Sequence, residues 1–287
     1  SLCRQLAQAW KEKPKDVGTS AEQFISNLTK LERVSGGGEI EKAILDEAAV
    51  NLLQVADTNY GGFGQAPKFP NAANLSFMFR YSKLSGITKF QEFTLMTLKK
   101  MAKGGLFDQI GGGFTRYSVD MIWKVPHFEK MLYDNGQLLT LYSKAYSVYK
   151  IPRFKEVVFQ TIQWLSSEML DKSGAFYSAI DADSEGVEGK FYVWKKKELE
   201  TLLGEDYPLF SAYYNVNSIG YWEHDTYILL RKDDDAKLAK QFNISVEELT
   251  RKIESAKSIL MKERATRIRP GLDDKSLTSW NGLMLKG

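Results

Sequence analysis

The stretch from Val125 to Asn135 carries the densest set of side chains that could move protons. It contains His127 and, seven residues later, Asp134. On a helix that begins at Pro126 these two residues share one face, about 10 Å apart along the axis, which suits two groups flanking a sugar-sized molecule. Histidine titrates nearest to neutrality, so His127 is the expected acid or base. It could instead cap the helix or bond a buried carbonyl.

A second group of carboxylates lies in the acidic stretch Asp181–Gly186. Asp181, Asp183 and Glu185 have the spacing of the first oxygen ligands of a calcium loop, with glycine in the sixth position. The twelfth position holds Tyr192 in place of a bidentate glutamate, so calcium is the least favoured of three interpretations. The stretch could also form an acidic hairpin turn, or line a pocket where paired carboxylates act on a glycosidic centre.

Asp273 and Asp274 stand just before the last predicted helix. Either Asp274 or Ser276 could cap that helix, and the two adjacent carboxylates with Lys275 could equally anchor a ligand. The glycine-rich loops of the chain are not followed by Lys-Ser or Lys-Thr, which excludes a phosphate loop. With two histidines and no cluster of histidine and cysteine, we expect neither a metal site nor a cofactor.

A repeated loop indicates the elements that must position these residues. Asp57–Phe63 and Asp108–Phe114 follow one pattern, with aspartate first, paired glycines and phenylalanine last, and Asp171–Phe176 is a shorter copy. Apolar residues recur at helical spacing between the copies, which is typical of stacked helical hairpins. Glycine allows the backbone to approach a ligand or a neighbour closely. We therefore expect Phe63 and Phe114 at the same end of successive hairpins, around the mouth of a helical ring.

Periodicity and breaker residues predict an all-α fold, an incomplete (α/α)6 toroid with short β-hairpin insertions in its loops. A ring of six hairpins, each of roughly 50–60 residues, exceeds this chain, and both ends read as cut helices, so we expect an internal piece of a longer protein. Helices are predicted at about 19–34, 40–55, 74–85, 88–103, 126–149, 152–170, 199–203, 246–260 and from 276 onward. Strands are predicted at 176–180 and 191–194, flanking the polar turn 181–190, and at 226–230.

The composition indicates a globular protein with no nucleic-acid or membrane partner. The 287 residues include 39 basic and 36 acidic side chains, which leaves a net charge of only +3. The single cysteine, Cys3, excludes an internal disulfide framework. No stretch approaches the roughly 18 apolar residues of a membrane span, and the first residues lack a signal-peptide pattern. We therefore expect a cytoplasmic location.

Five blocks of the chain resemble, in the same order, those of the YyaL and spermatogenesis-associated protein 20 family. They are Gly61–Pro70, Asp108–Asp120, Trp123–Asn135, Phe176–Gly186 and Leu272–Met284. The resemblance implies a thioredoxin-like domain followed by an (α/α)6 barrel similar to six-hairpin glycosidases and to N-acylglucosamine and cellobiose 2-epimerases. Residues 1–35 would then lead out of a covalently linked thioredoxin-like domain. Residues 36–287 would form the N-terminal and central part of the barrel.

Taken with the residues above, the resemblance implies a site for a sugar or amino sugar. His127 would transfer a proton, with Asp134, Asp181 and Asp183 as its catalytic carboxylate partners. The expected reaction is that of a sugar epimerase or isomerase, or of a glycoside hydrolase. Substrate-binding residues would be the aromatic walls Phe63, Phe114, Trp123 and Trp222 and the polar residues Lys68, Asp108, Arg116, Glu129, Glu223, Asp273 and Asp274.

Departures from the family pattern bear on this chemistry. The chain has Thr115 and Gly271 where the family usually has histidine, and Gly220–His224 replaces a Gly-Asn-x-Glu-Gly block. Sugar 2-epimerases of this fold are thought to use two histidines, so a glycosidase-like or binding role gains weight if those positions held the pair. The alternative to an enzyme is a scaffold domain for the thioredoxin-like domain. Carboxylates converging on His127 would favour the enzyme, and carboxylates spent on helix caps and lysines would favour the scaffold.

Overall fold

The computed structural model describes residues 2–32 and 41–287, and the chain divides into two compact units, Ser1–Ile44 and Leu45–Gly287. The first unit contains the helices α1 (Leu2–Glu12) and α2 (Pro14–Glu32). α2 begins earlier than the predicted start near residue 19, with Pro14 in its first turn, where the missing N–H has no helical partner to lose. The predicted end of this helix at Val34 and the following glycine break lie outside the described residues.

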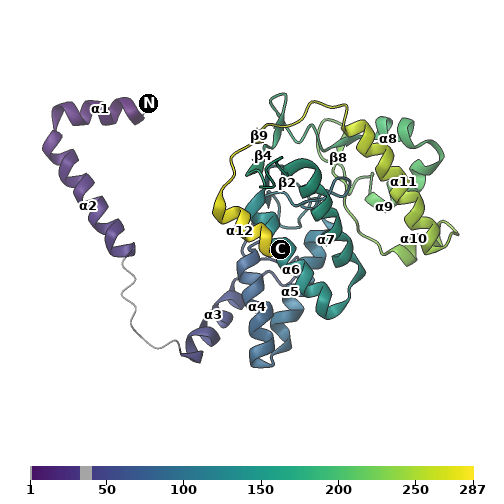
Figure 1. The fold of residues 1–287 in the computed structure, drawn as a ribbon, viewed down its shortest axis with the longest axis horizontal. Helices are drawn as coiled ribbons and strands as arrows, with labels where there is room; N and C mark the ends of the chain where they lie inside the picture. Colours follow the sequence, from purple (N-terminus) through teal and green to yellow (C-terminus); the bar gives the residue numbers. More distant parts are fainter. Residues whose placement is uncertain (1, 33–40) are drawn as a thin grey trace. The chain divides into compact units, whose positions relative to one another are not determined.

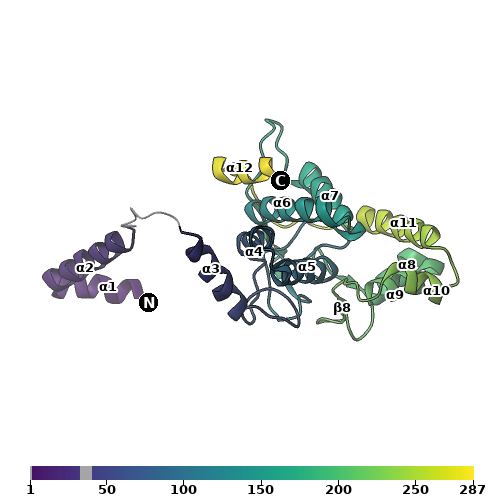
Figure 2. The same ribbon diagram turned by 90° about the horizontal axis from the view of Figure 1, so that it is seen from below.

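The second unit is built on two antiparallel helical hairpins. α4 (Ala72–Ser85) and α5 (Thr88–Lys103) form one, and α6 (Leu132–Tyr149) and α7 (Pro152–Trp164) form the next (Figures 1 and 2). α4 packs on α6 and α5 on α7, while α12 (Thr278–Lys286) also packs on α6. Hairpins packed side by side are the units of an α/α toroid, so the predicted all-α class with short strands in the loops is confirmed.

The other helices of this unit flank the hairpins. α3 (Lys42–Gln54) leads into the first glycine loop, and a π-helical turn, Leu165–Met169, extends α7. A second helical group has its own apolar core around Trp194, Phe210 and Leu260 (Figure 1). It comprises α8 (Lys196–Leu203), α9 (Tyr207–Tyr214), α10 (Asp235–Gln241) and α11 (Val246–Arg264).

The strands are only two residues long, and most of them join distant segments. The three-stranded antiparallel sheet consists of β3 (Lys130–Met131), β4 (Ala179–Ile180) and β9 (Leu272–Asp273). Three pairs complete the set: β1 (Tyr117–Ser118) with β2 (Pro126–His127), β5 (Asp183–Ser184) with β6 (Val187–Glu188), and β7 (Trp194–Lys195) with β8 (Thr226–Tyr227). The strands predicted on either side of the polar turn 181–190 therefore do not pair with each other, because β4 pairs with β3 and β9, and β7 with β8.

The helix predicted from Pro126 is wrong in its first six residues. This segment is extended and forms β2 and β3, and α6 begins only at Leu132. Sheet pairing uses the backbone groups that a helix would need: the Arg116 N–H donates to the Glu129 carbonyl at 2.8 Å, and the Leu132 N–H donates to the Ser178 carbonyl at 2.9 Å. Helical spacing of side chains is a weak preference that such long-range pairing overrides.

The repeated glycine loops share one geometry. In each, the first aspartate accepts hydrogen bonds through its side chain from backbone N–H groups two or three residues later. Each loop is closed by an antiparallel bridge, which joins Ala56 to Phe63, Phe107 to Phe114, and Leu170 to Phe176. The segments that follow the first two loops pair with each other through Lys68 and Ser118, so these loops lie at the same end of the hairpins.

The repeated geometry of the loops serves packing within the protein. Their phenylalanines do not form the walls of a mouth. Phe63 packs on Phe93 with ring centroids 5.4 Å apart, and Phe114 is fully buried against Tyr142 at 5.3 Å. Two of the loop glycines lie against large aromatic side chains: a Cβ at Gly62 would lie 2.5 Å from Trp123, and one at Gly113 would lie 2.7 Å from Trp164. The close approach that glycine permits is therefore to the protein itself.

Replacing Gly62 with alanine should lower the free energy of unfolding by about 2–4 kcal/mol, because it adds overpacking to the strain of a positive φ. Gly64→Ala is the matched control, since Gly64 also has positive φ, +69°, but a Cβ there would meet nothing within 4 Å. We expect it to cost about 1 kcal/mol. Urea denaturation of both variants measures the difference, and equal losses would contradict the packing role.

Candidate functional site

The three-stranded sheet separates two groups of charged side chains. Neighbouring residues of a strand point to opposite faces. Lys130 pairs with Ile180, which pairs with Leu272, and these three side chains line a pocket on one face. The residue next to each of these belongs to the other face by the same alternation. These neighbours are Glu129, Asp181 and Gly271. The Asp181 N–H donates to the Gly271 carbonyl at 2.8 Å and so continues the pairing there.

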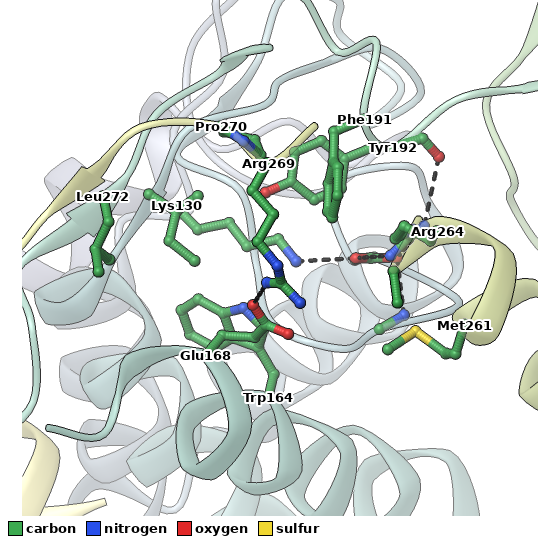
Figure 3. A pocket seen from close by; sticks show the side chains of 14 residues that line it. Lys130, Trp164, Glu168, Phe191, Tyr192, Met261, Arg264, Arg269, Pro270 and Leu272 are labelled. Atoms are coloured by element: carbon green, nitrogen blue, oxygen red, sulfur yellow. Dashed lines mark hydrogen bonds and ion pairs between the residues drawn. The ribbon is translucent and has the colours of Figure 1, made fainter. Parts of the chain in front are cut away.

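The pocket on the first face has a volume of about 120 Å³ (Figure 3). Its floor is the buried carboxylate of Asp108, which accepts from Lys130 Nζ at 2.9 Å and from Arg264 Nη1 at 2.7 Å. Arg269, which is half exposed, reaches across to Glu168 and pairs with it. The apolar lining consists of Trp164, Ile180, Phe191, Tyr192, Met261, Ala265, Pro270 and Leu272.

Asp108 is held in its charged form by its neighbours. Burial alone would raise the pKa of this carboxyl, but the charges of Arg264 and Lys130 lower it well below its usual range. Its Oδ1 also accepts from the backbone of Ile110 and Gly111. The first loop repeats the arrangement, because Lys68 is fully buried and pairs with Asp57. Both aspartates are thus committed to loop closure and to a lysine.

The second group, here called the Asp134 cluster, consists of Arg116, His127, Glu129, Tyr133 and Asp134. Arg116 Nη1 donates to Glu129 Oε2 at 2.8 Å, and the same oxygen lies 3.8 Å from His127 Nε2. The side chains of Arg116, His127 and Glu129 are 23–39% exposed, so the cluster is partly accessible to solvent. Here the structure brings together four residues that the sequence predicted.

Asp134 is the most perturbed carboxyl of this cluster. Burial, assisted by the nearby charge of Glu129, raises its pKa to about 7, although Arg116 opposes the shift. Asp134 lies in the first turn of α6, where the helix dipole favours the charged form of a carboxyl. Its pKa is nevertheless raised, so the effect of burial outweighs that of the dipole. Its buried Oδ2 has no hydrogen-bond partner among the described residues. A carboxyl in this state can hold a proton near neutral pH and give it to a bound group.

His127 lies in β2, ahead of the helix, and does not share a helix face with Asp134. Its Nδ1 lies 2.7 Å from Glu188 Oε1, and its ring stacks on Tyr117 with centroids 4.8 Å apart. Two glutamates, Glu129 and Glu188, therefore converge on the histidine, in place of the predicted aspartates. Carboxylates that converge on His127 are the arrangement expected of an enzyme. Asp57 and Asp108, which close their loops and pair with lysines, are arranged as expected of a scaffold.

Within the described part of the chain, none of the other predicted site residues forms a hydrogen bond or an ion pair with His127. Asp181 and Asp183 are exposed; Asp181 accepts from the Ala182 N–H at 2.7 Å, and Asp183 belongs to the β5–β6 hairpin. The turn is thus the acidic hairpin that the sequence allowed. Asp273 pairs with Lys275 at 2.9 Å, and Asp274 is exposed.

Of the predicted aromatic walls, Trp123 is fully buried, and its Nε1–H donates to the Tyr60 carbonyl at 2.9 Å. Phe114 is buried in the same core, so neither ring can stack on a ligand. Trp222 and Glu223 line an open groove of about 470 Å³ together with Glu188, the partner of His127.

The two positions that depart from the family pattern have different surroundings. The Thr115 side chain is buried, and its hydroxyl donates to the Leu106 carbonyl at 2.9 Å. Gly271 faces Asp181, and a Cβ built on it would lie 3.7 Å from the Asp181 Cβ, an ordinary contact. Position 271 therefore belongs to the face of the sheet that carries Glu129, and position 115 belongs to the core.

Several residues of the two groups had no signal in the sequence. Arg264, Arg269 and Glu168 come from helix ends and loops, and Arg264 meets Asp108 from 156 positions away. Glu188 could have been suspected only from the alternation of side chains in the acidic turn. Among residues 2–32 and 41–287, no group of three or more histidine, cysteine, aspartate or glutamate residues is placed to hold a metal ion. None of the helices in these ranges is long and apolar enough to cross a membrane.

Comparison with known proteins gives relatives over the whole chain. No family model matches. The chain is 33% identical over 320 residues to human spermatogenesis-associated protein 20, covering 99% of this chain and 40% of that protein. It is 36% identical over 323 residues to the rat protein of the same name, covering 100% and 41%. An uncharacterized protein of Caenorhabditis elegans is 34% identical over 316 residues, covering 100% and 43%. The chain thus spans about two-fifths of these relatives.

Solved structures show more distant similarity. A cellobiose 2-epimerase from Bacillus thermoamylovorans is 9% identical, with a TM-score of 0.42, over 86% of this chain and 71% of that chain. An unsaturated glucuronyl hydrolase specific for heparin is 12% identical, with a TM-score of 0.44, over 88% and 68%.

Proposed function

Because the chain belongs to the spermatogenesis-associated protein 20 family and spans about two-fifths of its curated relatives, we propose a function for this segment alone: acid–base chemistry on a sugar or amino sugar at the Asp134 cluster. The observation that carries the proposal is the largely buried Asp134 carboxyl with a pKa raised to about 7 and an unpartnered Oδ2. A carboxyl with this pKa is protonated in about half of the molecules at neutral pH, and that protonated fraction can act as a general acid.

Glu129 supplies the second carboxylate of the proposed site. Its ion pair with Arg116 fixes its position. Its charge is one of the causes that raise the pKa of Asp134, which supports a pairing of the two carboxyls. Glycosidic bond cleavage uses two carboxyl groups, one to protonate the leaving oxygen and one to activate water or attack the sugar. His127, held between Glu129 and Glu188, then orients Glu129 and can carry a proton to or from it.

Glycoside hydrolysis is the first choice of reaction, and epimerisation or isomerisation the second. Thr115 is committed to a core hydrogen bond, and Gly271 offers no base, so the positions where the resembled family has histidine cannot supply a proton-transferring pair. The scaffold role is less favoured, because the buried Oδ2 of Asp134 forms no hydrogen bond with the described residues that would tie it to the fold.

One expectation of the resemblance and one of the sequence pattern are proposed here as well. We propose that residues 1–35 lead out of a thioredoxin-like domain and that the protein is cytoplasmic. A structure of the complete protein tests the first, and fractionation of cells that express it tests the second.

The proposed chemistry is tested by turnover of a panel of aryl glycosides and free aldoses. On any substrate that is turned over, Asp134→Asn and Glu129→Gln should each lower kcat by about 10²–10⁴-fold, the usual contribution of a positioned acid or base. Asp206→Asn is the matched control, since Asp206 pairs with Lys252 on the surface at 2.7 Å and should not affect kcat. An Asp134→Asn variant with undiminished kcat would sink the assignment.

A further inference from the structure

The pocket beneath the three-stranded sheet takes no part in the proposed chemistry, because Lys130 and Glu129 point to opposite faces. Its lining has an excess of positive charge. Three cationic side chains, Lys130, Arg264 and Arg269, face two carboxylates, Asp108 and Glu168. Lys130 is 1% exposed and Arg264 5%, so this excess is held largely out of water. Lys130 and Arg264 share one buried carboxylate, Asp108. Burial lowers the pKa of the Lys130 ammonium and Asp108 opposes this shift, so a further anion in the pocket would favour the charged form of the lysine.

Hydrogen-bond donors remain free beside this charge. The Lys130 ammonium has three N–H groups, and two of them donate, to Asp108 at 2.9 Å and to the Gly112 carbonyl at 2.8 Å. Within the described part of the chain the third has no oxygen partner. Arg264 uses Nη1 and Nη2 on Asp108, and its buried Nε lacks a partner in the same ranges. These donors would satisfy an anionic oxygen that enters the pocket.

The walls and the size of the pocket define the rest of the ligand. Lys130 Nζ lies over the faces of two aromatic rings, 5.2 Å from the centroid of Trp164 and 4.9 Å from that of Tyr192 (Figure 3). These cation–π contacts put the ammonium beside flat rings on which a ring of the ligand could pack. The volume of about 120 Å³ is somewhat below that of an engineered cavity of about 150 Å³ that accepts benzene. The pocket therefore encloses less than a whole six-membered ring. Because Arg269 at its edge is half exposed, the rest of a ligand with one such ring would lie outside the pocket.

We propose that this pocket binds a small organic monocarboxylate with a single six-membered ring. One excess positive charge matches one carboxylate, whereas a phosphate monoester carries about −1.5 to −2 at neutral pH. The ring would lie against Trp164 and Tyr192, and the carboxylate would accept from Lys130, Arg264 or Arg269. The ring can be aromatic or that of a sugar acid, and this binding does not depend on the function proposed for the Asp134 cluster.

Titration calorimetry with benzoate and glucuronate tests the proposal, with benzamide and glucose as the neutral counterparts. We expect at least one acid to bind about tenfold or more tightly than its neutral counterpart, the effect of one charge-assisted hydrogen bond. The acid that binds identifies the ring. If neither acid binds better than its counterpart, the proposal is overturned.

Variants of the Arg269–Glu168 pair then locate the binding and test the charge argument. Arg269→Gln cancels the excess charge and should weaken binding of the acid about tenfold, and Glu168→Gln increases the excess and should tighten binding. The double variant restores an excess of one and should bind within about threefold of the unchanged protein. Lys275→Gln removes an exposed cation that lies outside the pocket and should have no effect. Equal affinities across the Arg269 and Glu168 variants would place the binding elsewhere and refute the site.

Discussion

Replacing Asp108 with asparagine should lower the free energy of unfolding by about 3–5 kcal/mol, the usual cost of breaking a buried ion pair by removing one partner. Asparagine keeps an oxygen for the loop N–H groups of Ile110 and Gly111. What it removes is the negative charge between Lys130 and Arg264, which are almost wholly buried. The variant therefore isolates the charge of Asp108 from its role in closing the loop.

Urea denaturation at neutral pH measures this loss. Asp234→Asn is the matched control, because Asp234 is 83% exposed and pairs with Lys103, so its removal should cost about 0–1 kcal/mol. The lowered pKa of Asp108 adds a pH signature. Its stabilising effect is fully present above the unfolded pKa, near 3.8, and is lost as pH falls through the lower folded pKa. A loss for Asp108→Asn no larger than for Asp234→Asn would show that the buried network does not stabilise the fold.

Replacing Asp134 with asparagine should have the opposite effect, stabilising the protein by about 2–4 kcal/mol at pH 8 and changing little at pH 4. The folded pKa is raised from 3.8 to about 7. Between these values the folded state holds a proton that the unfolded chain releases, so the contribution of this carboxyl to stability falls as pH rises. Above pH 7 the folded protein contains a buried, unpaired carboxylate. Asparagine has the same shape and no charge, so it escapes that cost.

The measurement is the free energy of unfolding of both proteins from pH 4 to pH 8. Only the difference between them matters, since other groups titrate equally in each. Asp206→Asn, which removes a surface carboxyl, should track the unchanged protein at every pH. If the Asp134→Asn curve runs parallel to it as well, Asp134 is not perturbed, and its proposed role as an acid loses its basis. Because no substrate is needed, this experiment separates the state of the carboxyl from the identity of the reaction.

The loops show how much of the fold the sequence determined. Aspartate, paired glycines and phenylalanine at fixed spacing close the same turn in the first two copies, and most helices lie within a few residues of their predicted bounds. These features depend on hydrogen bonds and backbone preferences within a few residues, which the local sequence contains. The contact of Gly62 with Trp123 and the burial of Phe114 are not local, so the interpretation of the loops as walls of a mouth was wrong.

The candidate site was decided mostly by tertiary structure. The sequence singled out His127, Asp134, Arg116 and Glu129 by type and by resemblance, but it placed His127 on a helix. Pairing of β2 with β1 and of β3 with β4 puts it on a strand next to Glu188. The pKa of Asp134 depends on burial beneath neighbours, and the partners of Asp108 come from β3 and from the end of α11. Charge and burial act through space, and only the folded chain determines which groups are within a few ångströms of each other.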